Sequence, residues 1–257
     1  MSVFSFRTVY DMTDALCDNF HRQLTALNLQ KIQINLAFSG GNTPGVFFER
    51  LATDQGNPIR RNDWNKVHIF WVDERCVAPD HPESNYSMTE RLLLRPIGLN
   101  DNQVHRIRGE NEPEEESTRY SQVIRNMVGE VNDIPVFDWI FLGVGEDGHT
   151  ASLFPDRPDL LRSSSIYAVA RHPVSGQFRV TMTGPVIIKA ERITFLVTGQ
   201  SKSKVIRQIM NNEPDAAGYP AFFIKSAKRS VDWYLDASAS EQLKIKGRDK
   251  HQEGKEP

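Results

Sequence analysis

Apolar positions recur along the chain with two different spacings, and the spacing changes from one segment to the next. Between residues 11 and 29 the large apolar side chains fall three or four residues apart, which is the stripe of an amphipathic helix. Residues 32–38 alternate apolar and polar side chains, and a serine and two glycines follow them. This second pattern predicts a strand that ends in a loop.

Further short apolar runs, separated by helical spacing, predict an alternation of strands and helices. The apolar runs span 67–72, 136–144 and 193–198, and the helical segments lie near 84–94, 113–130 and 200–210. Alternation of this kind predicts an α/β fold with an open, mostly parallel sheet and helices on both faces. We expect one such domain over residues 1–240. Residues 241–257 are polar and charged, so they are predicted to form a disordered tail.

Charge and cysteine content bear on the class of protein. The net charge is −2 at pH 7, so we expect no global positive field that would recruit nucleic acid or an anionic membrane. No signal peptide is evident at the N-terminus, and no stretch approaches the roughly 18 apolar residues that cross a bilayer. Cys17 and Cys76 are the only cysteines, and they are expected to be reduced thiols of a cytoplasmic protein.

Three loops that follow predicted strands have unusual compositions. This position matters because ligands of open α/β sheets bind beyond the carboxyl ends of the strands. The first loop is SGGNTP at residues 39–44. Its glycines let backbone N–H groups approach an anion, and a helix N-terminus adds free donors. Thr43 is predicted as the N-cap and Pro44 as the first helical residue. The loop suits a phosphate, and a tight turn with a capping threonine is the alternative.

The second loop is Asp73-Glu74-Arg75, directly after the apolar run at 67–72. Arg75 could hold an anion or polarise a carbonyl group, with an acidic neighbour fixing the plane of its guanidinium. A surface ion-pair group is the alternative. The position at the carboxyl end of a strand favours a functional role.

The third loop, GVGEDGHTASLFP at 143–155, combines three glycines, two acids and a histidine. His149 beside Asp147 could form a general base with a carboxylate that orients it. A structural histidine is the alternative, but the density of glycine and acid favours the catalytic interpretation. Ser152 lacks the Gly-x-Ser-x-Gly setting of a serine nucleophile. There is no His/Cys cluster with metal spacing, so neither a metal nor a cofactor is expected.

In this order, SGGNTP, FWVDER with SNYSM, and GVGEDGHTASLFP resemble the signatures of the 6-phosphogluconolactonase family. The resemblance continues through RVT at 179–181, GQSK at 199–202 and WYLD at 233–236, and it covers residues from about 5 to 240. It implies the Rossmann-like α/β fold that this family shares with glucosamine-6-phosphate deaminases. Those deaminases carry a tyrosine where this chain has Arg75, and a GHIAFNEPG-like continuation in place of GHTASLFP. Both departures favour the lactonase.

The resemblance implies an enzyme that hydrolyses 6-phospho-D-glucono-1,5-lactone to 6-phosphogluconate in the oxidative pentose phosphate pathway. The implied catalytic residues are His149 as general base, Asp147 as its orienting group, Arg75 at the lactone or its developing charge, and Asp73. The residues that it assigns to the substrate phosphate are Ser39, Gly40, Gly41, Thr43, Arg179 and Lys202. Apart from the family, Arg179 would be an ordinary strand arginine and Lys202 an ordinary residue at the start of a helix.

Two other functions stay open at this stage. One is an amino-sugar-phosphate deaminase or isomerase, in which Asp73 would abstract a proton from carbon. The other is a sugar-phosphate-binding module without turnover, against which the intact Asp147, His149 and Arg75 argue. The sequence departs from its relatives at Lys225, Lys228 and Arg229, where a more neutral turn is usual. The expected ligand is a small sugar phosphate lactone, and the oligomeric state is left open.

Overall fold

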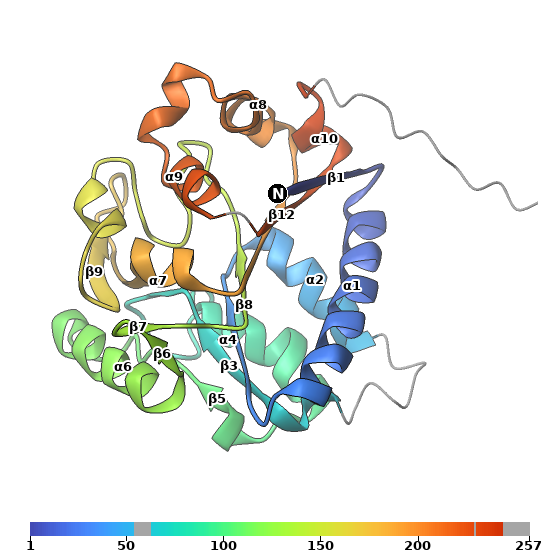
Figure 1. Ribbon diagram of the computed structural model, residues 1–257. Helices are drawn as coiled ribbons and strands as arrows, with labels where there is room; N and C mark the ends of the chain where they lie inside the picture. Colours follow the sequence, from blue (N-terminus) through green and yellow to red (C-terminus); the bar gives the residue numbers. More distant parts are fainter. Residues whose placement is uncertain (54–62, 229, 244–257) are drawn as a thin grey trace, which may run out of the picture.

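The computed structural model describes residues 1–53, 63–228 and 230–243 (Figure 1). In this part of the chain a seven-stranded sheet runs in the order β1-β12-β11-β8-β2-β3-β5, and every neighbouring pair is parallel. Its strands are β1 (Ser2–Phe6), β2 (Ile34–Phe38), β3 (Val67–Trp71), β5 (Val104–His105), β8 (Trp139–Leu142), β11 (Arg192–Val197) and β12 (Val231–Asp236). The predicted α/β fold with a mostly parallel sheet is confirmed.

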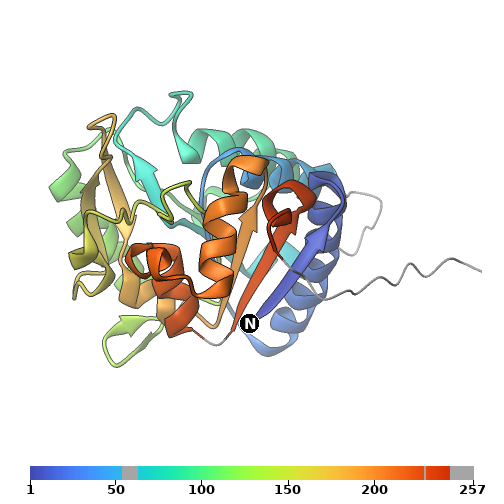
Figure 2. The ribbon, with the colours of Figure 1, turned by 90° about the horizontal axis from the view of Figure 1, so that it is seen from above.

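Helices pack against both faces of this sheet, as Figures 1 and 2 show. On one side lie α1 (Val9–Gln30) and α2 (Asn42–Thr53), and on the other lie α7 (Gly184–Lys189) and α9 (Pro220–Ala227). The remaining helical segments include α4 (Asn85–Thr89), a π-helical turn (Glu90–Leu94), α5 (Arg95–Ile97), α6 (Pro113–Met127), α8 (Ser203–Asn211) and α10 (Ala237–Ser240). The central strands are covered on both faces, which explains why β2 and β8 are buried throughout.

A smaller antiparallel sheet was not predicted, yet it matters most for the site. It contains β4 (Asp73–Arg75), β10 (Phe178–Met182) and β9 (Tyr167–Arg171), in the order β4-β10-β9. The chain leaves β3 of the large sheet and enters β4 after a single residue, Val72. The carboxyl end of β3 is therefore also the start of a second sheet. A two-stranded hairpin, β6 (Glu130–Val131) with β7 (Ile134–Pro135), lies apart from both.

The start of α2 differs from the prediction. The helix begins at Asn42, so Thr43 lies inside the first turn and is not the N-cap. The hydroxyl group of Thr43 is paired instead with that of Thr198, at 2.6 Å. This contact joins the loop after β2 to the loop after β11. The Thr43 hydroxyl therefore bonds to Thr198 at the end of a distant strand and does not cap the helix. Local spacing in the sequence does not reveal such a partner.

The predicted tail falls mostly outside the described residues. Residues 241–243 are described, and there Gln242 Nε2 donates to Ser203 Oγ at 3.0 Å while Leu243 packs partly buried against the core. The remainder, 244–257, and Arg229 of the basic C-terminal cluster lie outside the described residues. The boundary at residue 240 stays a prediction.

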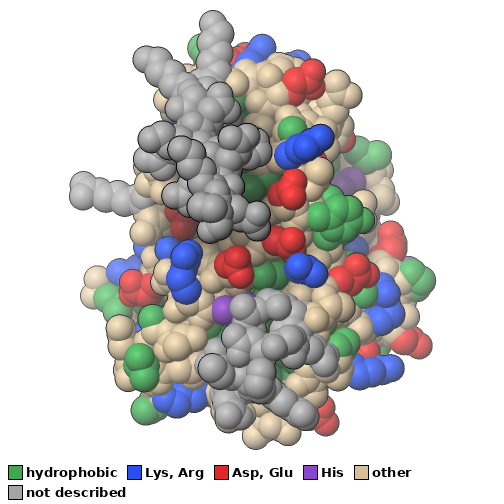
Figure 3. Space-filling view, turned by 90° about the vertical axis from the view of Figure 1, so that its right-hand side faces the viewer, with side chains coloured by type: hydrophobic (Ala, Val, Ile, Leu, Met, Phe, Trp, Pro, Cys, Tyr) green, Lys and Arg blue, Asp and Glu red, His purple; other side chains and the backbone are tan. Residues whose placement is uncertain are grey.

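The surface of the described chain agrees with the near-neutral net charge. On the face that Figure 3 shows, acidic and basic side chains are interspersed. Within the described residues, no helix has the length and apolar character needed to span a membrane. In this described part of the chain neither cysteine forms a disulfide; Cys17 lies in the core and Cys76 is partly buried beside the small sheet.

Candidate active site

A cavity of about 440 Å³ opens where the loops after β2, β3, β8 and β11 meet. Nine of the ten predicted site residues line it, and these are Ser39, Gly40, Gly41, Thr43, Asp73, Arg75, His149, Arg179 and Lys202. The tenth, Asp147, bonds to the His149 ring. Four loops that are far apart in sequence therefore meet at the carboxyl ends of the parallel strands, where such sheets bind ligands.

His149 and Asp147 form a close pair in the loop after β8. His149 Nδ1 lies 2.6 Å from Asp147 Oδ1, and the His149 backbone N–H donates to the same oxygen at 3.2 Å. Desolvation raises the pKa of Asp147, but the hydrogen bond and charge of His149 outweigh it and bring that pKa down to about 2. Asp147 is therefore ionised at neutral pH. A carboxylate on Nδ1–H leaves Nε2 with a free lone pair, which is the arrangement of a general base.

The glycines of this loop make room for two neighbouring rings, those of His149 and Tyr219. A Cβ at Gly145 would lie 2.1 Å from His149 Nδ1, and a Cβ at Gly148 would lie 2.3 Å from the ring of Tyr219. Gly148 also has a φ of +80°, and Ala151 has a φ of +52°, which is unusual for a residue with a side chain. Strain of this kind is found at functional sites, where the surrounding structure holds it in place.

The two glycines in the loop after β2 are required for different reasons. Gly41 has a φ of +111°, a conformation that side chains disfavour. Gly40 is needed for space, because a Cβ there would lie 1.7 Å from Asn85 Oδ1. The Ser39 hydroxyl is buried and has no hydrogen-bond partner among the described residues. Together with the N-terminus of α2, these features offer several free donors to an anion.

Glu74, predicted only as a neighbour of Arg75, holds the rim of the cavity together. This carboxylate is 2% exposed and accepts four hydrogen bonds. The donors are Arg75 N at 2.8 Å, Asn85 N at 2.7 Å, Tyr86 N at 2.8 Å and Ser84 Oγ at 3.0 Å. Burial raises the pKa of Glu74, although these bonds act in the opposite direction. We call Glu74 and its four partners the Glu74 bracket.

The Glu74 bracket places Asn85 in the cavity wall, although the local sequence pattern does not point to this residue. Asn85 is buried, and its Nδ2 donates to Asp73 O at 2.8 Å. Its amide therefore stands between the glycine loop and the end of β3. Asn85 belongs to the SNYSM segment that resembles the family, but the local pattern gives this asparagine no role.

Arg75 and Arg179 lie side by side on the small sheet. In the register of β4 with β10, the Cα atom of Arg179 is opposite that of Arg75. Arg75 Nη1 donates to the backbone carbonyl of Glu83. Arg179 Nη1 lies 3.5 Å from Ser152 Oγ, which in turn donates to Asp73 Oδ2 at 2.7 Å. Ser152 is buried, and its hydroxyl group links the Asp73 carboxylate to the Arg179 guanidinium.

Lys202 occupies a different wall, in the short 3-10 turn Gln200–Lys202 after β11. Its Nζ lies 3.9 Å from Glu146 Oε1, a carboxylate that is 66% exposed. Lys225 of the basic C-terminal cluster is engaged elsewhere, because it donates to Ile209 O and Asn212 Oδ1. Neither Lys225 nor Lys228 lines the cavity.

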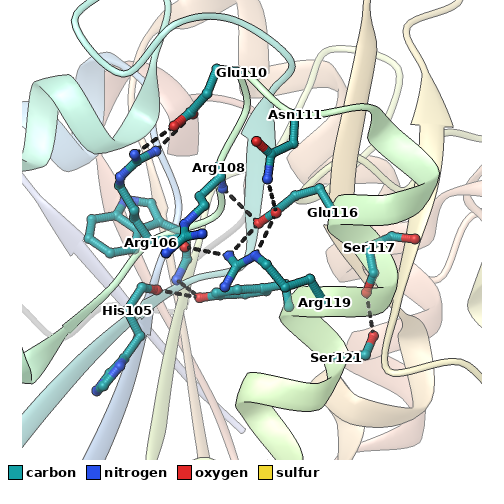
Figure 4. Close-up of polar contacts among 11 residues, drawn as sticks. His105, Arg106, Arg108, Glu110, Asn111, Glu116, Ser117, Arg119 and Ser121 are labelled. Carbon is teal, nitrogen blue, oxygen red and sulfur yellow. Dashed lines mark hydrogen bonds and ion pairs between the residues drawn. The ribbon is translucent and has the colours of Figure 1, made fainter.

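A further buried carboxylate, Glu116 in the first turn of α6, bonds to the loop that precedes this helix (Figure 4). It accepts from Arg108 N at 2.7 Å, Asn111 Nδ2 at 3.0 Å, and Arg119 Nε and Nη2 at 2.7 and 2.6 Å. These bonds fix the loop before α6, in which Gly109 packs so close to β4 that a Cβ would lie 2.3 Å from Arg75 O. Glu116 ends the acidic stretch EPEEE at 112–116, and it is nonetheless only 1% exposed.

Among the described residues, no group of three or more histidine, cysteine or acidic side chains is arranged to hold a metal ion. The residues of the cavity provide a candidate general base, a set of hydrogen-bond donors that suits a phosphate, and two arginines.

Comparison with known proteins places these features in a family. The model of the glucosamine-6-phosphate isomerases/6-phosphogluconolactonase family matches residues 7–233. The 6-phosphogluconolactonase of Haemophilus influenzae is 37% identical over 241 residues, which is 93% of this chain and 98% of that protein. The structure of the 6-phosphogluconolactonase from Trypanosoma cruzi superimposes with a TM-score of 0.83 at 25% identity, covering 95% of this chain and 97% of the other. A monomeric glucosamine-6-phosphate deaminase shares the fold, with a TM-score of 0.74 at 19% identity over 94% of this chain and 99% of the other.

Proposed function

The chain belongs to the glucosamine-6-phosphate isomerase/6-phosphogluconolactonase family and is a lactone hydrolase of its 6-phosphogluconolactonase branch; from this premise we propose how it converts 6-phospho-D-glucono-1,5-lactone to 6-phosphogluconate. The observation that carries the proposal is the His149–Asp147 pair, 2.6 Å apart, at a cavity whose other walls carry anion donors.

His149 Nε2 takes a proton from a water molecule, whose oxygen attacks the lactone carbonyl carbon. Asp147 holds Nδ1–H and stabilises the imidazolium that forms. The tetrahedral intermediate then collapses, the bond from carbon to the ring oxygen breaks, and the imidazolium returns its proton to that oxygen. A general base of this kind contributes about 10²–10⁴-fold to the rate.

The phosphate of the substrate fixes the sugar ring against the base. The glycine loop, the unpartnered Ser39 hydroxyl and the N-terminus of α2 supply neutral donors, and Lys202 supplies a charge. Binding energy from this remote group aligns the carbonyl carbon with the attacking water. A lactone without the phosphate is expected to be a poor substrate for the same reason.

The test of this function is the hydrolysis of freshly prepared 6-phosphoglucono-δ-lactone, measured against its spontaneous rate. Release of ammonia from glucosamine 6-phosphate is measured in parallel, because the related deaminases share the fold. We expect hydrolysis far above the spontaneous rate and no ammonia. Ammonia release without lactone hydrolysis would assign Asp73 the role of a carbon base and overturn the proposal. Binding of 6-phosphogluconate without turnover of either substrate would identify a binding module.

A further inference from the structure

The 3-10 turn that carries Lys202 into the cavity begins at Gly199, and the peptide groups of Gly199 determine where the turn points. Gly199 is the N-cap of the turn and has a φ of +95°. Its carbonyl group accepts from Lys202 N at 3.1 Å, which closes the turn. A rotation of the chain at Gly199 would therefore move the backbone of Lys202 with it.

Asp236, the last residue of β12, holds Gly199 from the neighbouring strand. β12 is parallel to β11, and their register pairs Leu235 with Val197. Asp236 is therefore level with the start of the loop after β11. Both of its carboxylate oxygens accept from Gly199 N, Oδ1 at 3.1 Å and Oδ2 at 3.2 Å. Hydrogen bonds from N–H groups to a carboxylate are roughly twice as strong as those between neutral groups.

The same carboxylate caps the C-terminal helix α10. Asp236 is the N-cap of this helix, and its Oδ1 also accepts from Ala239 N at 2.7 Å. One side chain thus joins the loop after β11 to α10. The bond from Gln242 to Ser203 joins the same two parts of the chain a few residues further along. The end of the described chain is therefore attached to the wall of the cavity that carries Lys202.

The side chain of Lys202 is itself only weakly held. Its Nζ lies 3.9 Å from Glu146 Oε1, and the Glu146 side chain is 66% exposed. An ion pair of this kind contributes little in water. Ordering a long side chain on a ligand costs free energy, and a backbone that already directs the side chain toward the ligand reduces that cost. The placement of the Lys202 backbone therefore affects how well its ammonium group can serve an anion.

We propose that Asp236 is a positioning residue for the substrate phosphate and that it acts through Gly199 on Lys202. This inference rests on the proposed function, in which Lys202 supplies a charge to that phosphate. Asp236 is not one of the residues that line the cavity, so it affects the affinity for the ligand without touching it. Its negative charge would repel a phosphate, which means that its contribution is the geometry of the loop.

Two substitutions of Asp236 separate this geometry from the charge and from the helix cap. Asp236→Ser keeps an N-cap for α10, but its shorter side chain gives up the bond to Gly199 N. Asp236→Asn removes the charge and keeps an oxygen at the position of Oδ1, to which Gly199 N and Ala239 N both donate. If Asp236→Ser does not fold, Asp236→Thr, which also caps a helix, takes its place with the same expectation.

Calorimetric titration with 6-phosphogluconate measures the effect on binding. Asp236→Ser is expected to bind this ligand about 3- to 10-fold more weakly than the wild type, which corresponds to the cost of ordering one long side chain. Asp236→Asn is expected to bind within twofold of the wild type. In both variants kcat for the lactone should stay within twofold, because the base is untouched. Equal weakening by Asp236→Asn and Asp236→Ser would overturn the geometric role.

A double-mutant cycle links the effect to Lys202. In the Lys202→Met background, Asp236→Ser is expected to change the affinity by less than twofold. The same loss in both backgrounds would overturn the inference, because Asp236 would then act independently of Lys202. Ser240→Ala is the matched control on α10. It removes the bonds of Ser240 Oγ to Ser5 Oγ and Asp236 O, leaves the Asp236 carboxylate in place, and is expected to bind as the wild type does.

Hydrolysis of the lactone by the same wild-type preparation separates this inference from the proposed function. If the wild type hydrolyses the lactone and Asp236→Ser binds 6-phosphogluconate as tightly as the wild type, only the role of Asp236 is wrong. If the wild type does not hydrolyse the lactone, the proposed function is wrong, whatever the titrations show.

Discussion

At the scale of single residues, the contact between Asp147 and His149 decides which imidazole nitrogen can act. The 2.6 Å hydrogen bond uses Nδ1 and leaves Nε2 free. Asp147→Asn keeps the size of this group but can present an N–H to Nδ1, which favours the wrong tautomer. We expect kcat to fall by about 10²–10⁴-fold with little change in KM, as for an orienting carboxylate in other hydrolases. Steady-state kinetics measure this, with the exposed Asp156→Asn in the same loop as the control. A kcat within threefold of wild type would show that Asp147 does not orient the base.

Contacts between residues that lie close together in the sequence could be predicted from the local pattern. His149 and Asp147 are two positions apart and flanked by glycines, so local pattern sufficed. Asn85 and the bridge from Ser152 to Asp73 depend on contacts across 12 and 79 positions of the chain. No spacing rule reaches that far. Their roles became visible only once the strands were placed.

At the scale of elements, the Glu74 bracket ties β4 to the start of α4 and so positions the wall that carries Arg75. Glu74→Gln replaces one accepting oxygen by a donor that faces other donors. We expect a loss of about 2–4 kcal/mol in the free energy of unfolding, because each buried donor without a partner costs about 1–3 kcal/mol. The kcat/KM value is expected to fall as well, since Arg75 loses its fixed position. Urea unfolding and kinetics check both effects. The exposed Glu83→Gln on the same rim is the control, and equal behaviour of the two variants would contradict the bracket.

The edge strand β5 carries a pH-dependent contact. His105 Nε2 lies 2.9 Å from His68 Nδ1, and desolvation together with the charge of His68 lowers the pKa of His105 to about 4. Between about pH 6.5 and pH 4 the unfolded chain protonates His105 more readily than the folded chain does. The contribution of the contact to the free energy of unfolding is therefore present above this range and is lost as the pH falls through it. Because His105 is partly solvated, we expect only about 1–2 kcal/mol.

Urea unfolding at pH 7 and pH 5 checks this prediction. His105→Gln should reduce the difference in unfolding free energy between the two pH values, relative to wild type. His81→Gln, at an exposed position before α4, is the control. If His105→Gln leaves the difference in unfolding free energy between pH 7 and pH 5 unchanged, the His68–His105 pair does not contribute to the pH dependence of stability.

The elements that the sequence predicted are those with long, regular apolar spacing. The helix expected over 11–29 is α1 at Val9–Gln30, and the run at 193–198 is β11 at Arg192–Val197. The small sheet was missed because β4 has only three residues, all of them polar. Its pairing with β10 is a tertiary property, and so is the burial of Glu116 in a run of acids that looks solvated.

At the scale of the whole molecule, the chain after Leu243 is predicted to be dispensable. Ile245 is the only large apolar residue in 244–257, and burying it would yield at most about 3 kcal/mol. Ordering the segment would cost about 1–2 kcal/mol per residue. Deletion of 244–257 is therefore expected to leave the melting temperature and kcat/KM unchanged. Truncation after Ser240 is the comparison, because it also removes the Gln242–Ser203 bond and the packing of Leu243. A raised KM in the 244–257 deletion alone would indicate a contribution of this segment to substrate binding.

The central claim for the molecule is that the imidazole of His149 is the base that activates water for lactone hydrolysis. The most direct test is the rate of hydrolysis of 6-phosphoglucono-δ-lactone by His149→Ala, with and without added imidazole. We expect the variant to lose about 10²–10⁴-fold in kcat, to bind 6-phosphogluconate nearly as well as wild type, and to regain activity in proportion to the imidazole concentration. Retention of more than half the wild-type rate by His149→Ala would contradict the account.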